Sequence, residues 1–263
     1  MTVKMIATDL DITLLRKDKT LSDYTVSVFQ RCREEGIKIV FATSRPMRAV
    51  VNFDFYKQIT PDGAAYHSGA VLYAGDICIE KHGISQETVN KMLLSAYNDI
   101  GVKLAVEADD KFYSDIAPLD MWPGIEVTRI DYAALPMIYA DKIVFTDLRP
   151  DVIDAVSKIL PEELYMQLSE NKICMIMNRY ATKARGVMRL AKHFGIPLSD
   201  VVAFGDDYND VGMLRECGIG VAVADAIDEA KAAADDICDT SDNDGAAKWL
   251  EKNVLPFKNH SPG

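Results

Sequence analysis

Short apolar runs alternate with amphipathic segments in the first part of the chain. An amphipathic helix is predicted to begin after Ser22, a suitable N-cap, and to end at Gly36. A second helix is predicted after Pro46. The apolar runs predict strands over residues 3–8, 37–42, 64–67 and 71–79. This alternation is typical of βαβ units around a parallel sheet.

The last part of the chain repeats the alternation. Apolar runs predict strands over 201–204 and 219–223. Amphipathic segments predict helices over 182–194, 209–215, 226–234 and 244–252. The two ends of the chain therefore favour one shared α/β unit.

The middle of the chain has a different pattern. Helices are predicted over 86–97 and 150–159, and strands over 102–107, 111–115, 142–146, 164–168 and 173–177. Paired short strands with two helices indicate a separate α+β unit. We expect a catalytic core formed by residues 1–83 and 181–263, with residues 84–180 inserted as a second, substrate-specificity domain.

Composition and charge restrict the class of partner. The 263 residues contain 29 Lys and Arg against 40 Asp and Glu, a net charge of −11. This balance argues against nucleic acid and against an anionic membrane surface as the partner. We see no apolar run long enough to span a bilayer and no signal peptide. The five cysteines form no close pair, which is typical of a reducing compartment, so we expect a cytoplasmic protein.

Two groups of polar residues follow predicted strands, at the edge where open α/β sheets build their sites. Asp9, Asp11 and Thr13 follow the first strand. They form either an acidic loop that caps the next helix, or a pair in which one carboxylate attacks phosphorus and the other transfers protons. Asp206, Asn209 and Asp210 follow the strand 201–204. Either Asp207 or Asn209 of this segment caps the next helix, or the carboxylates of Asp206 and Asp210 share a site with those of Asp9 and Asp11. If these carboxylates share one site, their repulsion demands a cation, and Mg²⁺ fits best beside a phosphate.

Two further segments offer groups for a phosphate. Thr43, Ser44 and Arg45 follow the strand 37–42, and we expect their amides and hydroxyls to open a helix as an anion site. Lys183 lies near the start of the helix after the insert. Its ammonium is either an ordinary surface charge or a group that neutralises the phosphate and the carboxylates.

These segments, in this order, resemble the haloacid dehalogenase (HAD) superfamily, and the long insert resembles the C2B cap of its Cof-type (type IIB) subfamily. The resemblance implies a Rossmann-like core with a mobile cap. It implies that Asp9 is the nucleophile and a metal ligand, and that Asp11 is the general acid/base and lends its backbone carbonyl to the metal. Asp206 and Asp210 complete the implied metal site.

The same resemblance assigns the phosphate-binding groups. Thr43 and Lys183 would bind the phosphoryl group and take part in catalysis, Ser44 and Arg45 would assist, and Asn209 would orient phosphate or Lys183. The chain departs from the usual HAD pattern at Ile12, Ser44, His67-Ser68, Ala184 and Ala224-Asp225. None of these departures removes a catalytic carboxylate.

We therefore expect a Mg²⁺-dependent phosphatase that acts on small phosphorylated metabolites, sugar phosphates first, through a phospho-aspartate. Phosphoryl transfer of the phosphomutase type, a phospho-acceptor signalling module and a catalytically weak metabolite-binding protein remain as alternatives. The substrate and the oligomeric state do not follow from the sequence.

Overall fold

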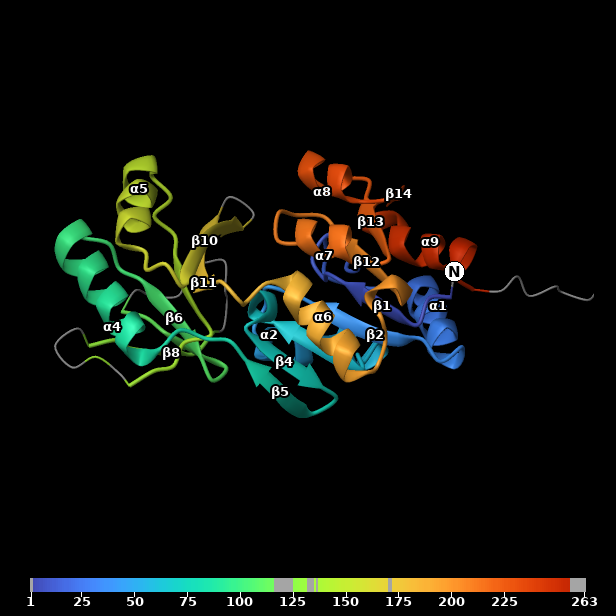
Figure 1. Ribbon diagram of the computed structural model, residues 1–263, viewed down its shortest axis with the longest axis horizontal. Helices are drawn as coiled ribbons and strands as arrows, with labels where there is room; N and C mark the ends of the chain where they lie inside the picture. Colours follow the sequence, from blue (N-terminus) through green and yellow to red (C-terminus); the bar gives the residue numbers. More distant parts are fainter. Residues whose placement is uncertain (1, 116–124, 132–134, 136, 170–171, 256–263) are drawn as a thin grey trace, which may run out of the picture. The chain divides into compact units, whose positions relative to one another are not determined.

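The computed structural model describes residues 2–115, 125–131, 135, 137–169 and 172–255 (Figure 1). The chain divides into two compact units. The first comprises Met1–Ile79 and Thr182–Gly263, and the second comprises Glu80–Ala181. The roles of catalytic core and cap that we expect for the two domains stay predictions.

The first unit is built on an eight-stranded sheet in the order β14-β13-β12-β1-β2-β3-β4-β5. Its strands are β1 Met5–Thr8, β2 Lys38–Ala42, β3 Gly63–Tyr66, β4 Val71–Ala74, β5 Ile77–Lys81, β12 Val201–Gly205, β13 Ile219–Val223 and β14 Asp236–Cys238. The six strands from β14 to β3 are parallel, and β4 runs antiparallel to β3. Every residue of β1 and β12 is buried, as expected of central strands covered on both faces.

Two groups of helices cover this sheet. The α-helices are α1 Asp23–Glu34, α2 Arg48–Val51, α3 Asp54–Gln58, α6 Lys183–His193, α7 Val211–Glu216, α8 Asp228–Ala233 and α9 Gly245–Asn253, with short 3₁₀ turns at His67–Gly69, Leu198–Asp200 and Ser241–Asn243. Helix α1 packs against α9, while α6, α7 and α8 contact one another in turn. The predicted cap of α1 is present, because the Ser22 side chain accepts a hydrogen bond from the Thr25 amide.

The order of strands reverses direction between β1 and β12. The chain builds outward from β1 through β2 and β3, then returns to β12 and builds outward on the other side. These two strands are parallel neighbours, with Thr8 opposite Phe204. The loops that follow them therefore meet at the reversal point, where open α/β sheets bind ligands.

The structure corrects three details of the predicted elements. Residues 71–79 form two strands, β4 and β5, separated at Gly75, whose φ of +54° allows a tight turn. Helix α7 begins at Val211, two residues after its predicted start. The edge strand β14 was not predicted, since it has only three residues and two of them are exposed.

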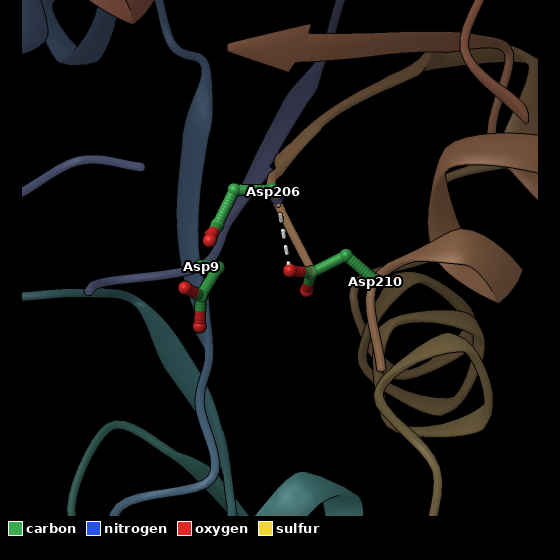
Figure 2. A group of neighbouring side chains, drawn as sticks. All are labelled: Asp9, Asp206 and Asp210. Atoms are coloured by element: carbon green, nitrogen blue, oxygen red, sulfur yellow. Dashed lines mark hydrogen bonds between the residues drawn. The ribbon is translucent and has the colours of Figure 1, made fainter. Parts of the chain in front are cut away.

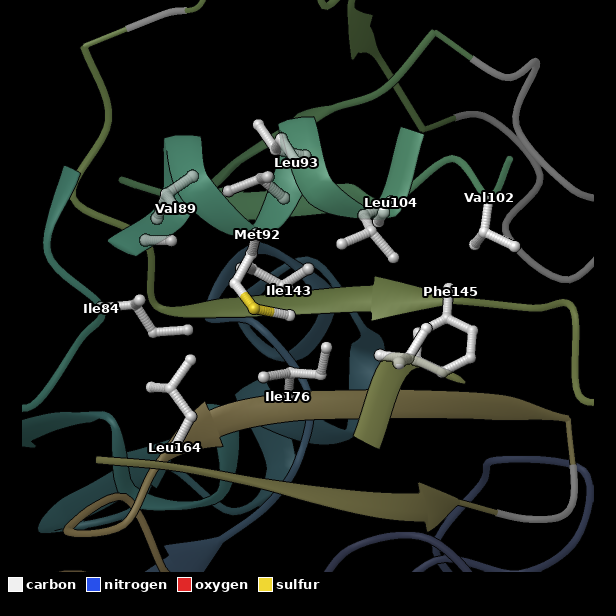
Figure 3. Packing of buried hydrophobic residues seen from close by; sticks show 14 of the residues in the cluster. Ile84, Val89, Met92, Leu93, Val102, Leu104, Ile143, Phe145, Leu164 and Ile176 are labelled. Carbon is white, nitrogen blue, oxygen red and sulfur yellow. The ribbon is translucent and has the colours of Figure 1, made fainter. Parts of the chain in front are cut away.

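The second unit holds a six-stranded sheet in the order β10-β11-β9-β6-β7-β8. Its elements are α4 Gln86–Ser95, a π-helical turn Ala96–Ile100, β6 Ala105–Ala108, β7 Lys111–Tyr113, β8 Val127–Thr128, β9 Lys142–Phe145, α5 Pro150–Ile159, β10 Leu164–Ser169 and β11 Ile173–Asn178. All pairs except β7 with β8 are antiparallel. The unit has its own core, in which Val89 and Met92 of α4 join the apolar cluster with Ile143 and Ile176 of the sheet (Figure 3).

The predicted fold class, an α/β core with a parallel sheet and an inserted α+β unit, is confirmed by these two sheets. Within the described residues, no helix is both long enough and apolar enough to cross a membrane.

Candidate active site

The loop after β1 places Asp9 against the end of β12. The main-chain N–H of Asp9 donates to the carbonyl of Phe204 at 3.0 Å, so the parallel pairing extends to the residue that begins the motif. Asp9 is buried, with 6 % of the residue exposed. Burial raises the pKa of Asp9 well above its usual value, although the nearby Lys183 ammonium opposes this shift.

Lys183 is the buried cation of the site. It is the first residue of α6, whose N-cap Thr182 accepts a hydrogen bond from the Arg185 amide. Its Nζ lies 2.6 Å from Oδ1 of Asp9 and 2.7 Å from Oδ1 of Asp210. Burial by itself would lower the pKa of Lys183, but the two carboxylates outweigh burial and raise it. Lys183 therefore stays charged between the two aspartates.

Asp210 organises the loop after β12. Its side chain is fully buried, and its Oδ2 accepts the backbone N–H groups of Asp206 and Asp207, both at 3.1 Å. A Cβ on Gly205 would lie 2.4 Å from the Cβ of Asp210, so only glycine fits beneath this carboxylate. Asp210 is the N-cap residue of α7, but its side chain makes no capping bond to that helix and turns back to the loop instead.

Asp9, Asp206 and Asp210 form a group that could hold a metal ion (Figure 2). One carboxylate oxygen from each lies within 4.8 Å of the others. Burial raises the pKa of Asp206 to about 7, and the negative charge of Asp210 adds to this effect, while a hydrogen bond from Thr13 at 2.6 Å opposes it. Three clustered oxygen donors whose charges repel one another fit a hard divalent cation such as Mg²⁺.

Asp11 has different partners. Its Oδ1 accepts from Lys19 Nζ at 2.6 Å and from Arg45 Nη2 at 2.7 Å, and its Oδ2 accepts from Arg45 Nε at 2.7 Å. Burial would raise the pKa of Asp11, but the hydrogen bonds and charge of Arg45, together with Lys19, lower it to about 2. Of the four residues predicted to hold a metal, the structure thus groups three by their side chains, and the contribution of Asp11 through its backbone carbonyl stays a prediction.

The segment after β2 corrects one expectation. Thr43, Ser44 and Arg45 do not open a helix, because the next helix, α2, begins only at Arg48 and has four residues. Pro46 disfavours helical backbone at the residue before it. The Arg45 amide donates to Thr43 Oγ1 at 3.1 Å, so this amide already has a partner within the chain. The assignment of these three residues to phosphate binding stays a prediction.

Two of the departures from the HAD pattern contact each other. The hydroxyls of Ser44 and Ser68 are 2.8 Å apart, and Asn209 Nδ2 donates to Ser44 Oγ at 2.8 Å. His67 and Ser68 both have positive φ, +49° and +55°, although neither is glycine. The Ser68 amide donates to the Thr43 carbonyl at 2.8 Å, which ties this turn to the segment after β2. Ser44, Ser68 and Asn209 therefore form one hydrogen-bonded chain.

Sequence reasoning did not assign a role to Lys19 or Ser68. Lys19 lies in a charged loop and carries no motif signal, and its contact with Asp11 depends on a backbone φ of +67° that the amino-acid type does not indicate. The departure at Ser68 was visible in the sequence, but its contact with Ser44 depends on the turn between β3 and β4.

The sequence matches the haloacid dehalogenase-like hydrolase family over residues 6–250. Two curated relatives from Bacillus subtilis are named 5-amino-6-(5-phospho-D-ribitylamino)uracil phosphatases. One is 26 % identical, with 94 % of this chain and 96 % of the relative covered, and the other is 24 % identical, with 96 % of each covered. A crystal structure of a haloacid dehalogenase-like hydrolase from Bacteroides thetaiotaomicron is similar with a TM-score of 0.82 at 22 % identity, covering 95 % of this chain and 99 % of that one.

A solved HAD subclass IIB sugar phosphatase is similar with a TM-score of 0.78 at 24 % identity, covering 95 % of this chain and 98 % of the other. At these identities the solved structures support the fold alone. The family match covers nearly the whole chain, and the predicted resemblance and the prediction of an enzyme are confirmed. The chain belongs to the haloacid dehalogenase-like hydrolases, and the two relatives from Bacillus subtilis are named as phosphatases.

Proposed function

We propose that this protein is a Mg²⁺-dependent phosphatase that hydrolyses small phosphorylated metabolites through a phospho-aspartate at Asp9. The observation that carries the proposal is the buried Asp9–Lys183–Asp210 group at the point where the sheet order reverses. Such a group places a nucleophilic carboxylate beside a fixed positive charge at the carboxyl end of parallel strands.

In the first step, a carboxylate oxygen of Asp9 attacks phosphorus, the new O–P bond forms, and the bond from phosphorus to the leaving oxygen breaks. Arg45 and Lys19 keep Asp11 ionised in the structure without substrate, so in this proposal Asp11 is protonated in the substrate complex and gives that proton to the leaving oxygen. In the second step, water attacks the phosphorus of phospho-Asp9, Asp11 takes a proton from this water, and Asp9 leaves as a carboxylate. The sum is one phosphate ester and one water converted to an alcohol and inorganic phosphate.

Lys183 and Thr43 bind the phosphoryl group in this proposal, with Ser44, Arg45 and Asn209 near them. The Lys183 ammonium lies 2.6 Å from Oδ1 of Asp9, so it can offset the negative charge that develops on the phosphoryl oxygens. Asp9, Asp206 and Asp210 would hold Mg²⁺, which when bound supplies positive charge that lets a phosphate dianion enter the acidic site.

For the substrate, we propose a small sugar or polyol phosphate. Two relatives are named for a phosphorylated ribitylamino compound, and one similar structure is a sugar phosphatase. We also propose that the protein acts in the cytoplasm, because its five cysteines are free thiols and a reducing compartment keeps thiols free.

The test compares wild type with Asp9→Asn in the release of inorganic phosphate from p-nitrophenyl phosphate and from a panel of sugar phosphates. We expect magnesium-dependent release by the wild type, loss of release with chelator, and no release by Asp9→Asn. Asp54→Asn is the control, because this carboxylate is 99 % exposed and pairs with Lys57 on the surface.

Turnover retained by Asp9→Asn, or turnover unaffected by chelator, would contradict the proposal. Analysis of the products with sugar bisphosphates separates hydrolysis from phosphoryl transfer to a second hydroxyl, since only hydrolysis releases phosphate in step with the loss of substrate.

A further inference from the structure

The side chain of Ser68 lies in a buried turn between β3 and β4. Residues 67–69 have φ angles of +49°, +55° and +98°, so His67 and Ser68 adopt left-handed backbone although neither is glycine. Ser68 is 1 % exposed. Strained conformations of this kind persist only where the surrounding structure imposes them, and they are found most often at functional sites. The neighbours of this turn therefore indicate what it supports.

Two segments of the candidate site hold the turn in place. The amides of His67 and Ser68 donate to two carbonyls in the segment after β2, at 3.1 Å and 2.8 Å. On another side, a Cβ on Gly69 would lie 2.3 Å from the carbonyl oxygen of Thr182, the N-cap of α6. The turn is thus packed between the segment after β2 and the start of α6, and the Ser68 hydroxyl is fixed with it.

The direction of the hydrogen bond between Ser68 and Ser44 follows from burial. Their Oγ atoms are 2.8 Å apart, and among the described residues Ser44 is the one partner of the Ser68 side chain. If Ser44 were the donor, the proton of the buried Ser68 hydroxyl would have no acceptor among these residues. An unsatisfied buried donor is costly, so Ser68 donates and Ser44 Oγ accepts.

Ser44 Oγ also accepts a hydrogen bond from Asn209 Nδ2, at 2.8 Å. A hydroxyl has two lone pairs and one proton. Because Ser68 and Asn209 fill both lone pairs, the Ser44 proton is directed toward a third group, which must be an acceptor. Ser44 is partly exposed, so a bound ligand can supply that acceptor. A donor of fixed direction is suited to binding an anion.

We propose that Ser68 is a positioning residue, which fixes the Ser44 hydroxyl as a hydrogen-bond donor to the phosphoryl group. This inference rests on the proposed function and assigns a role to a side chain that the resemblance to the HAD superfamily leaves without one. Ser68 acts through Ser44 and does not itself contact the substrate in this assignment.

The role predicts a loss of binding rather than a loss of chemistry. Ser44 contacts a phosphoryl oxygen in the bound substrate and in the transition state alike, and removal of such a contact raises KM and leaves kcat unchanged. A free hydroxyl has three staggered positions, so fixing one of them is worth about threefold in affinity. The polarisation of Ser44 by its two donors adds to this. We therefore expect the Ser68 hydroxyl to contribute about 3- to 10-fold.

The experiment uses the full chain with Mg²⁺. Isothermal titration calorimetry measures Kd for inorganic phosphate, and steady-state kinetics measures kcat and KM for p-nitrophenyl phosphate. Ser68→Ala should raise Kd and KM about 3- to 10-fold and change kcat less than about twofold. Ser68→Gly should do the same, because it also lacks the hydroxyl while glycine accepts the positive φ without strain. Ser44→Ala should raise Kd about 10- to 100-fold, as expected for a lost hydrogen bond to a charged group.

A double variant and a control complete the design. Ser44→Ala combined with Ser68→Ala should bind phosphate within about twofold of Ser44→Ala alone, since Ser68 then has no hydroxyl to orient. Ser241→Ala is the matched control. Ser241 also lies in a three-residue 3₁₀ turn and is 2 % exposed, but within the described part of the chain its hydroxyl has no hydrogen-bond partner. Its removal should change neither Kd nor kcat.

Unchanged phosphate binding in Ser68→Ala, or wild-type binding in Ser68→Gly, would overturn the positioning role, because the hydroxyl would then be dispensable. A double variant that multiplies the two single effects would also overturn it, as would an equal effect of Ser241→Ala. These outcomes leave the proposed function intact. A wild-type protein that binds inorganic phosphate but hydrolyses no phosphate ester would overturn the proposed function, and one that does neither would overturn both.

Discussion

Lys183 and Asp9 lie 174 residues apart in the sequence, and their side chains form a buried ion pair of 2.6 Å. The pair joins the first residue of α6 to the loop after β1, on either side of the long insert. Asp210 shares the same ammonium at 2.7 Å. One buried cation thus offsets two buried carboxylates, and its loss would leave both without compensation.

We therefore predict that Lys183→Met destabilises the metal-free protein by about 3–5 kcal/mol, the range measured when one partner of a buried ion pair is removed. The variant should also release no phosphate. Chemical denaturation at neutral pH in the presence of chelator measures the change in stability.

Lys4→Met is the control for this prediction. Lys4 pairs with Asp200 at 2.8 Å, but its side chain is 54 % exposed, so its loss should cost no more than about 1 kcal/mol. Similar midpoints of denaturation for the two variants would contradict the importance of the buried pair.

The group formed by Asp9, Asp206 and Asp210 predicts that the stabilisation of the protein by Mg²⁺ depends on pH. The folded protein holds the pKa of Asp206 at about 7, above the ordinary 3.8, because of burial and the charge of Asp210. Between these two values the native state keeps a proton that the unfolded chain has lost. The contribution of Asp206 therefore makes the metal-free protein less stable as pH rises from about 4 to about 7. Mg²⁺ binds the ionised carboxylates and should reverse this loss.

Thermal unfolding with and without Mg²⁺ tests this response at pH 5 and pH 8. At pH 8 and a 100-fold excess over its Kd, Mg²⁺ should stabilise the protein by about 2.7 kcal/mol, a rise in Tm of about 5–10 °C. At pH 5 the rise should be much smaller, because Asp206 is still protonated. Asp206→Asn should lose most of the magnesium effect at pH 8. An equal rise in Tm at both pH values would count against this group as the metal site.

The departure at Ile12 predicts an unusual tolerance to glycine. Ile12 has a φ of +63°, where a β-branched residue is strained by about 1–2 kcal/mol and glycine is not. We expect Ile12→Gly to change stability by less than about 1 kcal/mol, since relief of strain offsets the lost side chain and the added backbone entropy. Phosphate release should be retained.

Ile39→Gly provides the comparison. Ile39 is fully buried in β2, so its truncation should cost more than about 3 kcal/mol. Chemical denaturation of the two variants under the same conditions compares their free energies of unfolding. A loss for Ile12→Gly as large as that for Ile39→Gly would show that the positive φ is not a source of strain.

The sequence by itself determined the fold class and the loops that carry the candidate site residues. Buried parallel strands consist of consecutive apolar residues in the sequence. The positions of β1, β2, β12 and β13 could therefore be predicted from hydrophobicity alone. The polar residues directly after these runs identified the loops of the site, and the order of the motifs identified the family. Each of these inferences rests on a local pattern, because burial of a strand is imposed on consecutive residues.

Only the tertiary structure decided which side chains meet. The phosphate-binding role expected of Arg45 stays a prediction, and the structure adds that Arg45 contacts Asp11, as does Lys19, which no motif contains. The helix expected at Thr43 is absent, and Ser44 and Ser68 prove to be partners. These contacts depend on strand order and on left-handed turns at Ile12, Lys19 and Ser68. Hydrophobic periodicity indicates whether a residue is buried, but it does not indicate which distant segment packs against that residue.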